Sequence, residues 1–98
     1  MEDINAGIER WRETPGAVLI DLRDPEDFAA GHVPGAVNIL QEEIREKIPD
    51  LAEKDTPVFL CCYRGMRSWQ TEALLQARGY NAISIGGMEA YDGPLEEE

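Results

Sequence analysis

The most informative run of residues reads Val58-Phe59-Leu60-Cys61-Cys62-Tyr63-Arg64-Gly65-Met66-Arg67-Ser68. Its apolar first half predicts a buried strand, and its second half predicts a short loop that holds two arginines and a glycine. A helical pattern follows at once, because Trp69, Ala73 and Ala77 are spaced four residues apart. The loop therefore curls around the positive end of a helix with its backbone N–H groups turned inward. Such a cradle stabilises a thiolate and binds an anion, so this run predicts a thiolate site.

Length and composition predict one globular domain over residues 1–98. The chain has 98 residues, of which 43% are hydrophobic, and this is enough for a single core. Residues 93–98 are expected to form a frayed acidic tail. The N-terminus has no basic region followed by an apolar run, and no apolar stretch approaches the roughly 20 residues of a membrane span. We therefore expect a soluble, cytoplasmic protein with no membrane partner.

The charge balance excludes nucleic acid and anionic membranes as partners. A formal net charge of -11 and an isoelectric point near 4.4 repel nucleic acid and anionic membranes, which both require a basic face. Arg64 and Arg67 stand out against this background, because two cations in one short loop create a local positive potential suited to a small anion. The acidic surface and the small size favour a monomer.

The two cysteines are adjacent, which excludes a disulfide framework, since neighbouring residues can be bridged only with strain. A metal site is also disfavoured. One histidine, His32, and two sequential cysteines provide none of the spaced ligand pairs that zinc sites use. We therefore expect neither a metal nor a cofactor, and each thiol is either a packed small hydrophobe or a reactive group.

Strand and helix patterns alternate along the chain. Helices are predicted over residues 3–13, from Asp24-Pro25 to Gly31, over 42–48 before Pro49, over 68–78 before Gly79, and after Gly86-Gly87. Strands are predicted over residues 17–20, 36–39, 58–61 and 82–85. This alternation predicts a parallel sheet covered on both faces, with ligands at the carboxyl ends of the strands. Cys62 follows one of those ends.

Three segments in order resemble the single-domain rhodanese family of sulfurtransferases. They are Leu19-Ile20-Asp21-Leu22-Arg23 with Asp27-Phe28 and Gly31-His32-Val33-Pro34-Gly35-Ala36-Val37-Asn38; Cys62-x-x-Gly65-x-Arg67-Ser68; and Gly79-Tyr80 with Gly86-Gly87-Met88-x-Ala90-Tyr91. The resemblance implies a three-layer α/β fold with a central parallel sheet of about four to five strands. It also implies that Cys62 takes a sulfane sulfur from thiosulfate or a related donor, becomes a persulfide, and passes the sulfur to a thiol or cyanide.

The resemblance assigns further roles around Cys62. The residues expected to bind the substrate are Tyr63, Arg64, Gly65, Met66, Arg67 and Ser68. Arg67 is the best candidate to hold the donor's anionic oxygens, because a guanidinium offers a planar fork of donors. The partners implied are a small anionic sulfur donor and a thiol acceptor, either a thioredoxin-like protein or a low-molecular-weight thiol.

Other matching positions are expected to be structural. Asp21 and Arg23 are expected to form a polar contact that supports the loop, and His32 to be a satisfied packing residue. Trp69 continues a helical stripe and is expected in the core. Cys61 is expected to be buried and inert. Members of the family usually carry a short extra strand before the first helix, and only residues 1–3 are available for it here.

Two rival functions fit parts of the same pattern. Cys61-x5-Arg67-Ser68 matches the spacing of cysteine-dependent phosphatases, some of which share this fold. The glycine three residues after Cys62 favours the sulfurtransferase, as does Leu60 at the place where such phosphatases commonly have histidine. The second rival is a catalytically silent binding module, because a fold can persist after its chemistry is lost.

Overall fold

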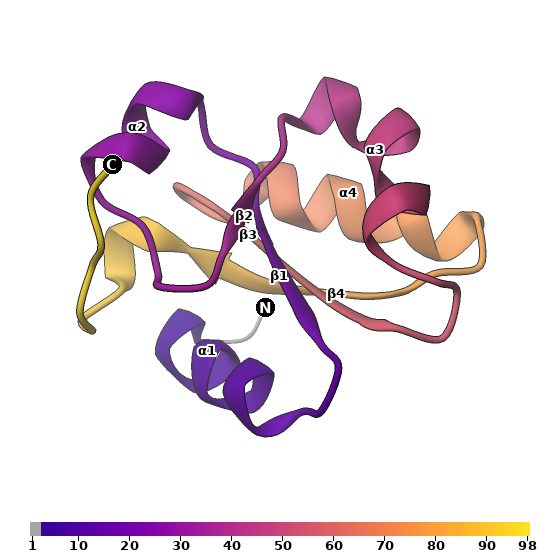
Figure 1. Cartoon of the computed structure of the whole chain (residues 1–98), viewed down its shortest axis with the longest axis horizontal. Coiled ribbons are helices and arrows are strands. Elements are labelled where there is room, and N and C mark those ends of the chain that lie inside the picture. Colours follow the sequence, from indigo (N-terminus) through magenta and orange to yellow (C-terminus); the bar gives the residue numbers. More distant parts are fainter. Residues whose placement is uncertain (1–2) are drawn as a thin grey trace.

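The computed structural model describes residues 3–98, and helices and strands alternate through them (Figure 1). The elements are α1 (Ile4–Glu13), β1 (Val18–Asp21), α2 (Pro25–Ala30), β2 (Val37–Asn38), the 3₁₀ turn η1 (Gln41–Glu43), α3 (Ile44–Leu51), β3 (Pro57–Cys62), α4 (Met66–Ala77), β4 (Asn81–Gly87) and the 3₁₀ turn η2 (Met88–Ala90). The strands form one parallel sheet in the order β2-β1-β3-β4. The predicted α/β fold with a central parallel sheet is confirmed.

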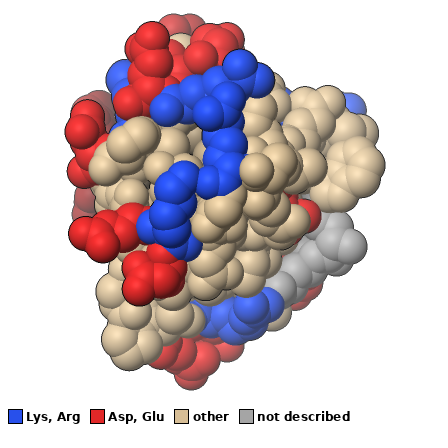
Figure 2. Space-filling view, turned by 90° about the vertical axis from the view of Figure 1, so that its right-hand side faces the viewer, with Lys and Arg blue, Asp and Glu red and all other residues tan. Residues whose placement is uncertain are grey.

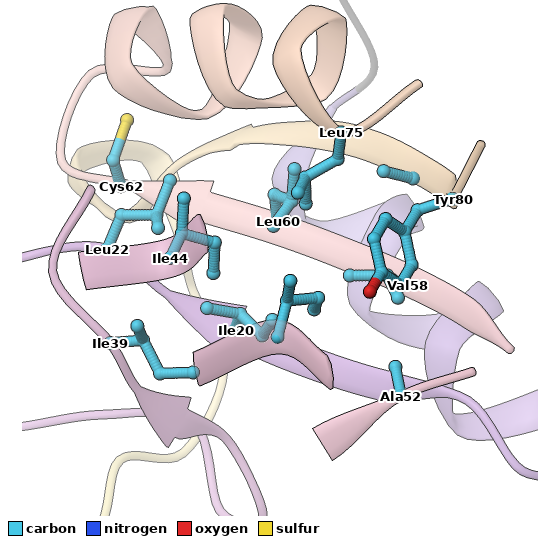
Figure 3. Close-up of a cluster of buried hydrophobic side chains, with 12 residues drawn as sticks. Ile20, Leu22, Ile39, Ile44, Ala52, Val58, Leu60, Cys62, Leu75 and Tyr80 are labelled. Atoms are coloured by element: carbon cyan, nitrogen blue, oxygen red, sulfur yellow. The ribbon is translucent and has the colours of Figure 1, made fainter. Parts of the chain in front are cut away.

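Helices cover both faces of the sheet, with α1 on one face and α3 and α4 on the other (Figure 1). Successive side chains of a strand point to opposite faces, so the strands divide the apolar residues into two cores. The core on the α1 side contains Ile4, Ile8, Leu19, Val33, Phe59, Cys61, Ile85 and Met88. The core on the other side contains Ile20, Leu22, Ile39, Ile44, Ile48, Ala52, Val58, Leu60, Cys62, Leu75, Tyr80 and Ala82 (Figure 3).

The carboxyl ends of β1 and β3 lie together at the left of Figure 1, because these strands are parallel neighbours. Figure 2 shows the opposite end of the molecule, where Lys and Arg side chains form a band bordered by Asp and Glu. Near the amino end of β3, Lys54 Nζ lies 4.0 Å from the centre of the Tyr80 ring and donates a hydrogen bond to the Arg78 carbonyl (2.6 Å). Lys54 thus packs against its neighbours at this end of the sheet, away from the carboxyl ends of the strands.

The helix α3 does not end at Pro49, contrary to the sequence prediction. Proline removes one N–H donor and crowds the carbonyl four residues earlier, yet the helix continues to Leu51. Helical bonding resumes beyond the proline, where the Ala52 N–H donates to the Ile48 carbonyl (2.9 Å). Ile44 and Ile48 are both buried one turn apart, and their packing holds the helix together across the missing bond.

The acidic C-terminal segment is not a frayed tail, and this expectation is corrected. Glu96 forms an antiparallel bridge with His32, with N–H to carbonyl distances of 3.0 and 2.8 Å. The Glu98 N–H also donates to the Ala29 carbonyl (2.9 Å). Leu95 packs against Gly31, where an added Cβ would lie 3.1 Å from Leu95 Cδ1. Backbone pairing and one apolar contact therefore fix this segment beside α2.

The described part of the chain begins at the N-terminal cap of α1. Asp3 is the N-cap residue, and its carboxylate accepts a hydrogen bond from the Asn5 N–H (3.2 Å). The expectation about an extra strand before α1 concerns residues 1–3, of which 1–2 lie outside the described part of the chain. Within residues 3–98, no helix has both the length and the apolar character that a membrane span requires.

Candidate active site

The candidate site lies at the carboxyl end of β3, where the chain turns into α4. Cys62 is the last residue of β3 and Met66 is the first of α4, so only Tyr63, Arg64 and Gly65 connect the two elements. Gly65 adopts a φ of +97°, a conformation that side chains other than glycine rarely allow. This turn points the N–H groups at the start of α4 back toward the end of the strand.

The sulfur of Cys62 sits inside the turn and accepts hydrogen bonds from its backbone. The Gly65 N–H lies 3.0 Å from Cys62 Sγ, and the Ser68 N–H lies 3.4 Å from it. The Ser68 hydroxyl is 3.6 Å away. In Figure 3 the sulfur points away from the rest of the core cluster, toward the start of α4. Donors converging at a helix N-terminus stabilise a negative charge, so the geometry suits a thiolate.

A small pocket opens over this sulfur. It has a volume of about 250 Å³ and is lined by Cys62, Tyr63, Arg64, Met66 and Arg67. Cys62 is only 1% exposed, so a reagent must enter the pocket to reach it. Of the residues expected to contact substrate, four thus line the pocket, while Gly65 and Ser68 lie beneath and donate to the sulfur.

The two loop arginines stand in different surroundings. Arg67 is partly buried, and its Nη1 donates to the Leu22 carbonyl (3.4 Å) and lies 3.9 Å from a carboxylate oxygen of Asp24. Arg64 projects into solvent, with its Nε 3.7 Å from a carboxylate oxygen of Glu89. Arg67 is therefore held near the pocket by contacts to the residues that follow β1, whereas the ion pair of Arg64 is exposed.

A buried ion pair supports the segment that Arg67 contacts. Both Nε and Nη2 of Arg23 donate to the Asp21 carboxylate at 2.9–3.1 Å, and Nη2 also donates to the Gly31 carbonyl (2.7 Å). Burial lowers the pKa of Arg23, but the hydrogen bond and charge of Asp21 outweigh that effect and leave the pKa above its ordinary value. Asp21 and Arg23 thus hold Leu22 in place between them.

His32 lies away from the pocket and has partners of its own. Its Nδ1 is 2.8 Å from the Phe28 carbonyl, and its ring stacks on Phe28 at 3.9 Å between centroids. Its Nε2 lies 3.7 Å from carboxylate oxygens of Glu96 and Glu98. The side chain therefore fastens α2 to the C-terminal segment. Within residues 3–98, nowhere do three His, Cys, Asp or Glu side chains gather closely enough to hold a metal ion.

Cys61 lies on the other face of the sheet from Cys62. It is buried in the core beneath α1, so its predicted burial is confirmed. Burial raises the pKa of the Cys61 thiol well above its usual range, and the negative charge of Asp21 raises it further. The phosphatase alternative requires Cys61 inside the loop, and the alternation of side chains along β3 places it outside.

Trp69 is exposed, contrary to the expectation that it belongs to the core. Its exposed fraction is 58%, while Ser68, Thr71 and Leu75 form the buried face of α4. The four-residue stripe that includes Trp69 runs along a neighbouring face of the helix. The buried face of α4 was not predicted, because two of its three buried residues are polar and a hydrophobic pattern cannot identify buried hydroxyls.

The sequence assigned no site role to three residues of β4 and η2 that contact the loop or the first turn of α4. Gly87 has no room for a side chain, since an added Cβ would overlap the Tyr63 carbonyl oxygen. The Glu89 N–H donates to the same carbonyl (3.0 Å). Ser84 Oγ lies 2.7 Å from Ser68 Oγ. The signal for Ser84 was a lone hydroxyl within an otherwise apolar strand pattern.

Comparison with known proteins identifies the family of this fold and loop. Residues 5–93 match the rhodanese-like domain family. The chain belongs to the rhodanese-like domain family. Its curated relatives include a protein from Pseudomonas entomophila named thiosulfate sulfurtransferase GlpE, which is 38% identical over 78% of this chain and 71% of the relative. The family resemblance expected from three sequence segments is therefore confirmed.

Solved structures of rhodanese-like proteins share this architecture. A rhodanese-like domain protein from Staphylococcus aureus superposes with a TM-score of 0.84 and 26% identity, over 100% of this chain and 99% of that one. An E. coli structure described as rhodanese with anions has a TM-score of 0.75 and 31% identity, over 84% of this chain and 99% of that one. The rhodanese-like fold thus extends through the whole described chain.

Proposed function

We propose that this rhodanese-like chain is a thiosulfate sulfurtransferase that carries sulfur as a persulfide on Cys62. The observation that carries the proposal is the position of Cys62 Sγ, which accepts backbone hydrogen bonds at 3.0 and 3.4 Å at the base of a pocket with Arg67 at its wall. The name of the Pseudomonas relative supports the reaction type.

The first half of the reaction moves sulfur onto the enzyme. The Cys62 thiolate attacks the outer sulfur of thiosulfate and forms a new S–S bond, while the S–S bond of thiosulfate breaks. Sulfite leaves with the electron pair of the broken bond. No external oxidant or reductant is needed, and the loop N–H groups stabilise the charge on Cys62 before attack.

The second half returns the enzyme to its starting state. An acceptor thiolate or cyanide attacks the outer sulfur of the persulfide, and Cys62 leaves as the thiolate. The loop geometry favours this step because the donors that hold the resting thiolate also stabilise it as a leaving group. The products are a persulfide of the acceptor thiol, or thiocyanate when cyanide is the acceptor.

Arg67 is the proposed anchor of the anionic donor. Its guanidinium lines the pocket of Cys62 and is positioned by Leu22 and Asp24. A guanidinium binds the oxygens of a sulfonate-like group through paired hydrogen bonds. Arg64 lies at the rim and adds positive charge. The anions named in the description of the E. coli structure are consistent with anion binding in this family.

A silent binding module is less well supported than an enzyme. A module that has lost its chemistry has no need for hydrogen-bond donors around a cysteine sulfur, yet the N–H groups of Gly65 and Ser68 both donate to Cys62 Sγ.

A cytoplasmic location is part of the proposal, and it is supported by two unpaired cysteines in a family of thiol chemistry. Nucleic-acid and membrane partners remain disfavoured by the charge of -11, and a monomer stays a prediction.

Intact-protein mass spectrometry after brief incubation with thiosulfate tests the function. We expect wild type to gain about 32 Da, the mass of one sulfur, and to lose it again with cyanide. Cys61→Ser should show the same gain, and Cys62→Ser should show none. If wild type gains no sulfur from thiosulfate or from polysulfide, the sulfurtransferase proposal is wrong.

A further inference from the structure

A pair of buried hydroxyls lies behind the sulfur of Cys62. Ser68 Oγ, 3.6 Å from Cys62 Sγ, lies 2.7 Å from Ser84 Oγ. Ser68 comes from the first turn of α4, and Ser84 comes from the middle of β4. Ser68 is fully buried and Ser84 is 6% exposed, so the pair is shielded from solvent. Ser84 has no role in the reaction described above.

The position of Ser84 is fixed by the strand and by the helix. β4 pairs with β3 in register up to Leu60 and Ser84, and the register then shifts before Cys62 pairs with Gly87. The Ser84 N–H does not lack a partner at this irregularity, because it donates to a carboxylate oxygen of Glu72 on α4 (2.7 Å). A bulge of this kind often re-aims side chains beside active sites.

The orientation of the two hydroxyl protons decides whether Cys62 Sγ can accept a hydrogen bond from Ser68. Each hydroxyl has one proton, and a separation of 2.7 Å means that one proton lies between the two oxygens. If Ser68 donated to Ser84, no hydroxyl proton would remain for the sulfur. If Ser84 donates to Ser68, the Ser68 proton can point at the Gly65 carbonyl (3.0 Å) or the Gly86 carbonyl (3.5 Å) while the Cys62 thiol donates to Ser68 Oγ (3.6 Å). Once Cys62 is a thiolate and has no proton to donate, the Ser68 proton can turn to Cys62 Sγ.

We propose that Ser84 is a positioning residue of the sulfurtransferase, which donates to Ser68 while the Ser68 hydroxyl donates to the Cys62 thiolate. Donation to Ser68 also polarises that hydroxyl, because hydrogen bonds in a chain strengthen one another in a buried site. When Cys62 carries a neutral thiol, the Ser68 proton turns to the Gly65 carbonyl. The inference rests on Cys62 being the nucleophile, and it adds a second layer of support from β4.

The test is the pH dependence of alkylation of Cys62 by iodoacetamide, followed by mass spectrometry. Removing one hydrogen-bond donor from the chain should raise the pH midpoint by roughly half a unit in Ser84→Ala. The rate constant for persulfide formation with thiosulfate, measured well below that midpoint, should fall roughly threefold, in proportion to the lost thiolate. Thermal unfolding of each variant verifies that it is folded.

Two matched variants separate the hydroxyl from side-chain shape. Ser84→Thr and Ser84→Val are nearly isosteric, but only threonine keeps the hydroxyl, so we expect the raised midpoint in Ser84→Val alone. This comparison also serves if Ser84→Ala does not fold. Thr71→Val is a control, because Thr71 is buried on the same face of α4 and its hydroxyl forms no hydrogen bond within the described structure. It should leave the midpoint unchanged.

A double variant tests whether Ser84 acts through Ser68. We expect Ser68→Ala to raise the midpoint, and Ser84→Ala to add no further shift in that background. Equal shifts in both backgrounds, or equal midpoints in Ser84→Thr and Ser84→Val, would overturn the proposal. Alkylation and persulfide mass are separate readouts, so failure of sulfur transfer on wild type is distinguishable from failure of the Ser84 mechanism.

Discussion

Cys61 and Cys62 are neighbours in the chain, but they belong to opposite sides of the sheet. Cys61 points into the core beneath α1, where burial and Asp21 raise the pKa of its thiol. Cys62 points toward α4 and meets two N–H donors at 3.0 and 3.4 Å. The comparison teaches that the reactivity of a thiol here depends on which face of β3 carries it, because only one face ends at the positive end of a helix.

The largest expected effect separates the two thiols directly. Cys62→Ala should lower sulfur transfer from thiosulfate to cyanide on the order of a thousandfold or more, because no nucleophile remains to carry the sulfur. Cys61→Ala should retain activity within a few-fold of wild type, since Cys61 lies outside the pocket. Steady-state assay of thiocyanate measures both. A comparable loss in Cys61→Ala would contradict the division between the two faces.

A second prediction concerns the anion site on the Cys62 side. Arg67→Gln removes the charge at the pocket wall, and we expect the KM for thiosulfate to rise roughly tenfold or more from the loss of a charge-assisted hydrogen bond. Arg64→Gln is the matched control and should change KM less, because the Arg64 side chain is 79% exposed. Equal changes in the two variants would indicate that general charge, rather than position, attracts the donor.

A third prediction tests how closely β4 supports the loop. Gly87→Ala places a Cβ against the Tyr63 carbonyl, and we expect a loss of about 2 kcal/mol in the free energy of unfolding, together with reduced activity. Gly87 has a φ of -126°, so overlap alone is responsible. Gly16→Ala is the opposite case, with a φ of +75° and open space around it. It should cost about 1 kcal/mol and leave activity intact.

Urea unfolding of both glycine variants, compared with their activities, provides the measurement. We expect Gly87→Ala to change the alkylation of Cys62 and to leave Cys61 protected, because Gly87 contacts the loop on the Cys62 side of the sheet. If Gly87→Ala is as stable and active as wild type, the contact between β4 and the loop does not support the site.

The smallest expected effect is the pH dependence of stability that arises from Cys61. Folding keeps this thiol protonated, because burial and Asp21 raise its pKa. In the unfolded chain the same thiol has its ordinary pKa of about 8.5. The stability that depends on the bound proton is complete below that pH and is lost as the pH rises toward the folded pKa. The free energy of unfolding should therefore fall by up to about 1.4 kcal/mol per pH unit from Cys61 alone.

Urea unfolding at several pH values checks this, with Cys61→Val as the reference. The stability of wild type relative to Cys61→Val should decrease as the pH rises above the unfolded pKa. Parallel pH profiles for the two proteins would show that Cys61 is not held neutral by its surroundings. Other groups that titrate in this range contribute equally to both proteins and cancel in the difference.

Much of the fold follows from local patterns in the sequence. The apolar runs, the caps and the glycines predicted the alternation of strands and helices, because these signals act over a few residues of backbone. Pro49 was misleading for a physical reason. The local rule that proline ends a helix was overridden by the tertiary packing of Ile44 and Ile48.

The candidate site also contains a part that the sequence predicted and a part that it did not. The motif from Cys62 to Ser68 is contiguous, so its turn and the helix that follows could be predicted from the residues themselves, although α4 begins at Met66, two residues before the predicted start. Trp69 could not be placed, because the face that α4 buries is selected by the hydroxyls of Ser68 and Thr71 meeting the sheet. A hydrophobic stripe indicates a buried face only when the buried residues are apolar.

By itself, the sequence determined the parallel α/β fold, the position of Cys62 at the end of a strand, and the family to which the chain belongs. Only the tertiary structure decided that Ser84 approaches Ser68, that Glu96 pairs with His32, and that Arg67 reaches Leu22. These contacts join residues 16 to 64 positions apart in the chain. Local propensity carries no information about contacts between residues so far apart in the chain, because these contacts depend on which strands lie next to each other in the sheet.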